Sequence, residues 1–239
     1  MKKLAAEFAG TFALVFAGTG AIIINDLSGG AITHVGISLT FGLIVFAMIC
    51  ALGSVSGAHL NPAVTAGFFL ARRFPARLVL PYITSQFAGA ILASAALRVM
   101  FMRHQTLGVT IPAGSNVFSF ILEIVLSGIL MFVILSVSSQ ASEKGLTAAM
   151  AIGAVIALAA LFGGPISGAS MNPARSLAPA LLSKHFAGLW IYLTAPLFGA
   201  ALAVPLCRCV QPAGCCSDVR KNQQRGAAGP LGTPPDICQ

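Results

Sequence analysis

Two copies of the triplet Asn-Pro-Ala hold the residues of this chain that could do chemistry. The first copy is Asn61, Pro62 and Ala63, and the second is Asn172, Pro173 and Ala174. Each copy follows a loop of small residues and precedes a short apolar run, so we expect a helix that starts with Asn as N-cap and Pro as first helical residue. The carboxamide oxygen of such a cap accepts a backbone N–H, which leaves the side-chain NH2 to donate to a passing polar molecule.

The helix predicted after each triplet is too short to cross a membrane alone. The first run, from Ala63 to Arg72, holds roughly eight helical residues, about 12 Å of helix against ~30 Å of hydrocarbon. Two half-helices that meet near the midplane from opposite sides would span it together, as in pores and transporters built from inverted repeats. Both would aim their positive ends at the asparagines, where cations and protons would be repelled.

Composition places the rest of the chain in a membrane. Hydrophobic residues make up 57% and charged residues 8% of the sequence, and the mean hydropathy is +0.90, values typical of membrane proteins. We expect an all-α membrane domain over residues 1–206, with inverted repeats at about 1–105 and 116–206 that open with Glu7 and Glu123. The six predicted full spans are 4–24, 34–52, 78–100, 118–137, 146–162 and 187–206.

The net charge of +8 reflects topology rather than a nucleic-acid partner. Most lysines and arginines fall on the face of the membrane that holds the N-terminus. Only Arg98, Arg103 and Lys184 fall on the opposite face, and Arg175 lies in the second loop. By the positive-inside rule, both termini are predicted to be cytoplasmic in a multi-pass protein of the cell inner (plasma) membrane. The basic residues are scattered over separate loops without interleaved aromatics, so the expected partner is the lipid bilayer and no nucleic acid.

The segments SGAHLNPAVT (56–65) and SGASMNPARS (167–176) resemble the two signature loops of the aquaporin and glycerol-facilitator family, and the resemblance covers residues 4–206. It implies an aquaporin-like bundle of six tilted spans and two re-entrant half-helices, assembled as a homotetramer with one pore per subunit. It also implies a passive channel, not an enzyme, that needs no cofactor, passes water and small uncharged solutes, and excludes ions and protons.

The resemblance identifies four residues as the narrowest constriction of the pore. In the family an arginine at the position of Arg175 lines this constriction, and counting from the triplets adds Phe41, Ala160 and Ala169. Strict water channels usually carry a histidine where this chain has Ala160, so we expect a wider and less polar opening. Glycerol facilitators have larger aromatic residues at the positions of Phe41 and Ala169, so their pattern does not match either.

The nodulin-like branch and its bacterial relatives are the most similar group, because their second loop often runs as residues 164–175 do here. That branch passes small uncharged polyhydroxy solutes, including glycerol and metalloid acids such as arsenous acid. A strict water channel remains the alternative.

Glu7 and Glu123 could either snorkel to the interface or be buried, and their matched positions favour burial. In the family such glutamates accept backbone N–H bonds and so brace the loops that carry the triplets. His59 would join the first of these networks, although simple loop packing is the usual role of a lone histidine.

Residues 207–239 have too little apolar surface to fold alone, so we expect a largely disordered cytoplasmic tail. It is rich in cysteine, and Cys207, Cys209, Cys215 and Cys216 could supply soft thiolates to As(III), Zn(II) or Cu(I). Their spacing matches no closed zinc pattern, so free thiols are the competing interpretation. One hypothesis is that the channel serves arsenic detoxification and that the tail binds trivalent arsenic.

Two other classes fit parts of the pattern. An ion-coupled secondary transporter also uses inverted repeats and broken helices, with Glu7 and Glu123 as its candidate titratable groups. A structural or adhesion protein could keep the same fold with a closed pore. The small side chains of Ala160 and Ala169 argue against such closure.

Overall fold

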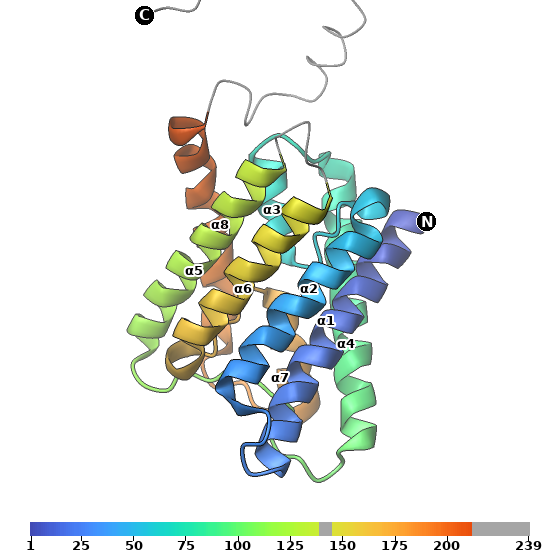
Figure 1. The fold of residues 1–239 in the computed structure, drawn as a ribbon, viewed down its shortest axis with the longest axis vertical. Coiled ribbons are helices and arrows are strands. Elements are labelled where there is room, and N and C mark those ends of the chain that lie inside the picture. The colour runs from blue at the N-terminus through green and yellow to red at the C-terminus, as the bar shows by residue number, and fades with distance from the viewer. Residues whose placement is uncertain (139–144, 212–239) are drawn as a thin grey trace, which may run out of the picture.

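The computed structural model describes residues 1–138 and 145–211, and these form a single bundle of helices without strands (Figure 1). The helices are α1 Lys2–Leu27, α2 Thr33–Ser56, α3 Pro62–Leu70, α4 Ala76–Met100, α5 Asn116–Val137, α6 Leu146–Ser167, α7 Pro173–Ser183 and α8 Leu189–Val210. All except α3 and α7 are long and apolar enough to cross a membrane. The predicted all-α membrane bundle is therefore confirmed, with six spans and two half-length helices.

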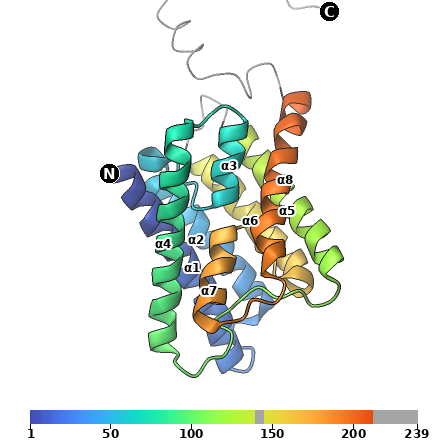
Figure 2. The same ribbon diagram turned by 180° about the vertical axis from the view of Figure 1, so that it is seen from behind.

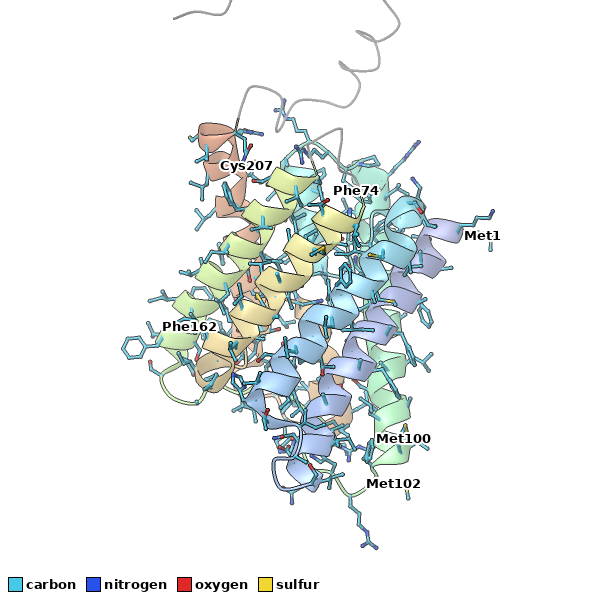
Figure 3. All side chains as sticks on the ribbon, viewed as in Figure 1. Met1, Phe74, Met100, Met102, Phe162 and Cys207 are labelled. Atoms are coloured by element: carbon cyan, nitrogen blue, oxygen red, sulfur yellow. The ribbon has the colours of Figure 1, made fainter. Side chains whose placement is uncertain are left out.

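The two halves of the chain repeat one arrangement. Helix α5 packs on α8 as α1 packs on α4, and α2 meets α6 between the halves. The short helices α3 and α7 lie one above the other between α4 and α8, and they contact each other (Figure 2). Met1 and Phe74 lie at one end of the bundle, and Met100 and Met102 at the other (Figure 3). The half-helices thus enter from opposite ends, as inverted repeats require.

Matched glycines let the spans approach closely. A Cβ on Gly42 would lie 2.5 Å from the carbonyl oxygen of Gly153, and one on Gly153 would lie 2.7 Å from that of Gly42. In the same way, a Cβ on Gly89 would collide with the backbone of α1, and one on Gly199 would collide with the backbone of α5. Because lipid tails are as apolar as leucine, such close backbone packing is what holds helices together in a membrane.

Helix α6 continues past residue 162, where the sequence predicted its end. Pro165 lies inside the helix and has no N–H, so it leaves the carbonyl oxygen of Leu161 without its helical partner. The Nε2 atom of His34 lies 2.8 Å from that oxygen, and because a carbonyl only accepts, Nε2 must donate. This contact from α2 lets α6 run on to Ser167, before Gly168 ends it at φ +82°.

Helix α8 also extends beyond the predicted span. It ends at Val210, so the expected boundary of the tail at residue 207 falls inside a helix, despite Pro205. The last turns therefore carry Cys207 and Cys209 on an ordered helix rather than on a flexible strand.

Candidate functional site

Both asparagines cap the half-helices as predicted. Asn61 has an extended backbone, and its Oδ1 accepts the N–H of Ala63 at 2.8 Å. Asn172 has a similar backbone, and its Oδ1 accepts the N–H of Ala174 at 3.0 Å and that of Arg175 at 3.4 Å. Because each cap ties up its carboxamide oxygen, the two NH2 groups are left as the functional donors.

The NH2 groups are not as free as the sequence predicted. Asn61 Nδ2 donates to the carbonyl oxygen of Met171 at 2.7 Å, and Asn172 Nδ2 donates to that of Leu60 at 2.9 Å. Each NH2 has two hydrogens, so one locks the opposite loop and one is left for the lumen. The reciprocal bonds join the two half-helices at the point where they meet.

The loops before the triplets have an unusual backbone that needs support. Ala58 and Leu60 in the first loop have φ values of 46° and 53°, and Ala169 and Met171 in the second have 42° and 52°. Residues with a Cβ occupy this left-handed region at a penalty of about 1–2 kcal/mol each. Alternating backbone conformations of this kind aim successive N–H groups at one point, where an anion can bind.

Glu7 supplies the anion in the first loop. It is fully buried, and its carboxylate accepts the backbone N–H groups of His59 and Leu60 at 3.0 and 2.8 Å. The hydroxyl of Ser56 at 2.7 Å and Nε2 of Gln86 at 2.8 Å add two further donors. Such charge-assisted bonds hold the strained loop in place.

Glu123 does the same for the second loop. It is also fully buried, and it accepts the N–H groups of Ser170 and Met171, both at 2.8 Å, and the hydroxyl of Ser167 at 2.8 Å. These bonds place both glutamates against the loop backbones, away from the lumen.

The sequence analysis missed a matched pair of tyrosines. Tyr82 donates its hydroxyl to the carbonyl oxygen of Ser56 at 2.9 Å, and Tyr192 donates to that of Ser167 at 2.6 Å. These are the only two tyrosines of the chain, and they are separated by almost the same interval as the two triplets. That shared interval is the signal that would have assigned them to the repeat.

His59 packs beside the first loop. Its ring stacks on Phe68 with 4.6 Å between centroids, contacts Phe74 and Tyr82, and places Nδ1 3.1 Å from the Thr65 hydroxyl. The backbone N–H of His59 joins the Glu7 network, while its ring belongs to an aromatic cluster that lines the cavity described next.

One cavity of about 760 Å³ brings the predicted residues together. Both asparagines line it, and so do the four residues predicted for the constriction: Phe41, Ala160, Ala169 and Arg175. Toward the end of the bundle that holds Met1 it reaches Lys3 and Phe74. Among the described residues the charged side chains that line it are basic, and no carboxylate does so. Such a lining disfavours cations.

Phe41 and Arg175 face each other in this lumen. The guanidinium carbon of Arg175 lies 5.2 Å from the centroid of the Phe41 ring, within the range of a cation–π contact. Nη1 of Arg175 donates to the carbonyl oxygen of Gly108 at 3.0 Å. Arg175 is therefore held in the bundle rather than snorkelling to the interface. Ala160 and Ala169 complete the wall with methyl groups.

The predicted thiol site is only partly described. Cys207 is fully buried and disulfide-bonded, whereas Cys209 is exposed and free. Cys215 and Cys216 lie outside the described residues. Within residues 1–138 and 145–211, no group of three or more His, Cys, Asp or Glu side chains is placed to hold a metal ion.

Comparison with known proteins agrees with this geometry. The major intrinsic protein family matches the chain over residues 1–206. Aquaporin NIP1-1 of Oryza sativa subsp. japonica is 47% identical over 201 residues, which cover 84% of this chain and 71% of that protein. Nodulin-26 of Glycine max is 43% identical over 201 residues, covering 84% and 74%.

A solved structure agrees as well. The aquaglyceroporin from Plasmodium falciparum superimposes with a TM-score of 0.80 at 26% sequence identity, over 87% of this chain and 99% of that one. The resemblance of the two loops to aquaporins, and to the nodulin-like branch in particular, is thereby confirmed.

Proposed function

Because the chain belongs to the major intrinsic protein family, whose members are channels rather than enzymes, we propose that it is a passive channel for water and for uncharged solutes of about the size of glycerol. The observation that carries the solute range is the lumen wall at the constriction. Opposite Phe41 and Arg175 it offers only the methyl groups of Ala160 and Ala169. A wall of this kind leaves room for a carbon backbone beside the guanidinium donors.

The midplane supplies the barrier to protons. Asn61 and Asn172 each keep one N–H for the lumen, so a water molecule between them turns its oxygen toward both donors. Its own hydrogens then point away in opposite directions, which interrupts the aligned chain that proton transfer needs. The N-terminal ends of α3 and α7 add about half a positive charge each at the same place. Together with the carboxylate-free lining, they repel cations.

Arsenous acid is a second solute that this lumen fits. It is uncharged at neutral pH and carries three hydroxyl groups, so Arg175 and the two asparagines can donate to it as they would to glycerol. A role in arsenic detoxification extends this proposal, with free tail thiols such as that of Cys209 as ligands of trivalent arsenic. Cys207 is disulfide-bonded and offers no thiolate, contrary to the expectation from the sequence.

We further propose that four copies assemble with one pore each, that both termini are cytoplasmic, and that the protein lies in the plasma membrane. The described spans support a membrane setting, because large apolar side chains such as Leu43 and Leu158 are more than half exposed on the outer surface of one bundle. Lipid or a neighbouring copy would cover them. Residues 1–206 would form the channel domain and 207–239 its tail.

Stopped-flow light scattering on proteoliposomes tests the proposal. With an impermeant osmolyte the vesicles should shrink much faster than protein-free ones, and with glycerol or arsenous acid they should shrink and then recover. Shrinkage without recovery would make this a strict water channel, and shrinkage at the lipid rate would indicate a closed pore. Dissipating the proton gradient should change nothing, because Glu7 and Glu123 are bound by the loops and do not line the cavity. Flux that stops on dissipation would instead identify an ion-coupled transporter.

A further inference from the structure

The segment between the two repeats reaches the constriction. The carbonyl oxygen of Gly108 is the acceptor for Nη1 of Arg175 at 3.0 Å, and in the described part of the chain it is the only hydrogen-bond acceptor that the guanidinium has. The place of this one carbonyl therefore helps to fix the guanidinium against the wall of the lumen, beside the ring of Phe41.

Gly108 is held there through its neighbour Leu107. The two residues have consecutive left-handed backbones, with φ of 53° and 71°, so the orientation of one peptide plane sets the next. Leu107 is fully buried against Ile23 and Leu97. Its backbone N–H donates to Nδ1 of His104 at 3.0 Å.

The ring of His104 is fixed on both sides. Because Nδ1 accepts the Leu107 N–H, the ring proton must sit on Nε2, which lies 3.3 Å from Oδ2 of Asp26. Asp26 belongs to α1, and the charged group from α4 is Arg98, whose Nη1 donates to the carbonyl oxygen of His104 at 2.7 Å. Arg98 also donates to the carbonyl oxygen of Leu182 in α7. The imidazole thus faces the carboxylate of Asp26 in α1, and Arg98 of α4 links the backbone of His104 to the end of α7.

We infer that His104 is a positioning residue for Arg175: its Nδ1 holds the Leu107–Gly108 turn whose carbonyl anchors the guanidinium, and so it sets which solutes pass. This rests on the proposed channel function and adds a residue that touches no solute.

Three variants separate the two ring nitrogens. His104→Asn keeps an acceptor oxygen at the position of Nδ1 and loses the donor to Asp26, whereas His104→Gln keeps a donor at the position of Nε2 and loses the acceptor. His104→Ala loses both. His185→Ala is the matched control, because this histidine follows α7 and, within the described residues, its ring bonds only the carbonyl oxygen of nearby Ser183.

The readout is the ratio of glycerol to water permeability in proteoliposomes, with thermal unfolding in detergent as a check on folding. Alanine and glutamine should lower the ratio about threefold or more, the scale expected when one bond to a charged group is weakened, because a released guanidinium obstructs glycerol more than water. Asparagine and the His185 control should keep the wild-type ratio.

The outcomes distinguish this inference from the channel proposal. If the wild type conducts neither water nor glycerol, the proposed function itself is wrong. If the wild type conducts and folded glutamine and alanine variants keep its ratio, His104 does not position Arg175. Equal losses in the asparagine and glutamine variants would also overturn the inference, because Nδ1 would then have no special part.

Discussion

The guanidinium carbon of Arg175 lies 5.2 Å from the centroid of the Phe41 ring, and both side chains line the same lumen. The two residues come from opposite repeats, so the constriction exists only when the halves of the bundle are packed together. A charged donor beside an aromatic ring, with the methyl groups of Ala160 and Ala169 completing the lining, suits a solute with hydroxyl groups on a carbon backbone. Substitutions of residues that line the constriction should therefore change which solutes pass while the protein still folds.

Ala160→His should convert the pore toward water selectivity. An imidazole is several heavy atoms larger than a methyl group, and even one misplaced methylene can change discrimination about tenfold. We expect glycerol permeability to fall by about tenfold or more while water still passes, as measured by vesicle recovery after osmotic shrinkage. Ala160→Ser adds a polar group without bulk and should keep glycerol flux. Unchanged glycerol flux in the histidine variant would place the constriction elsewhere.

Arg175→Ala should loosen the rejection of cations. A monovalent cation about 5 Å from the guanidinium is opposed by about 3 kcal/mol at an effective dielectric constant of 20, and 1.4 kcal/mol corresponds to about tenfold. We expect at least about a tenfold increase in cation leak, measured by vesicle potential with a voltage-sensitive dye. Arg175→Lys retains the charge and should remain tight to cations. If the alanine variant still excludes cations, the helix dipoles of α3 and α7 at the midplane supply the barrier to cations.

Gly18→Ala should narrow the pore through Phe41, although Gly18 itself does not line the cavity. A Cβ at Gly18 would overlap the ring of Phe41, which lines the cavity, so we expect the ring to be pushed toward the lumen. Water and glycerol permeability should both fall severalfold in stopped-flow measurements. Gly20→Ala is the control on the same helix, because its Cβ would meet nothing closer than 3.5 Å. Equal permeability in the two variants would show that Phe41 does not narrow the pore.

The site could be predicted from sequence where its geometry is local. Asn61 and Asn172 cap helices that begin at the next residue, and the length of an apolar run shows directly that a half-helix cannot span a membrane. The repeated spacing then paired the two copies. The constriction role of Arg175 was instead predicted from the family resemblance, since the matching position after the first triplet is Val64.

The parts that sequence reasoning missed depend on residues brought together by the fold. Nothing near Asn61 shows that its NH2 bonds the carbonyl oxygen of Met171. Nothing near Gly108 shows that it anchors Arg175. The end of α6 was predicted too early for the same reason. A proline predicts the end of a helix unless a distant side chain donates to the carbonyl oxygen that the proline leaves unpaired. In α6, His34 donates to the carbonyl oxygen of Leu161 that Pro165 leaves unpaired.

That contact can be tested by rescue. His34→Ala removes the donor to the carbonyl oxygen of Leu161, which should lower the stability by about 1 kcal/mol, the usual contribution of one hydrogen bond. Adding Pro165→Ala gives residue 165 an N–H for the same carbonyl, so the double variant should regain most of the melting temperature lost in detergent. Replacing Pro81 of α4 by alanine instead should rescue nothing. If both double variants melt as low as His34→Ala alone, the histidine stabilises α6 through packing against Gly164 rather than through the freed carbonyl.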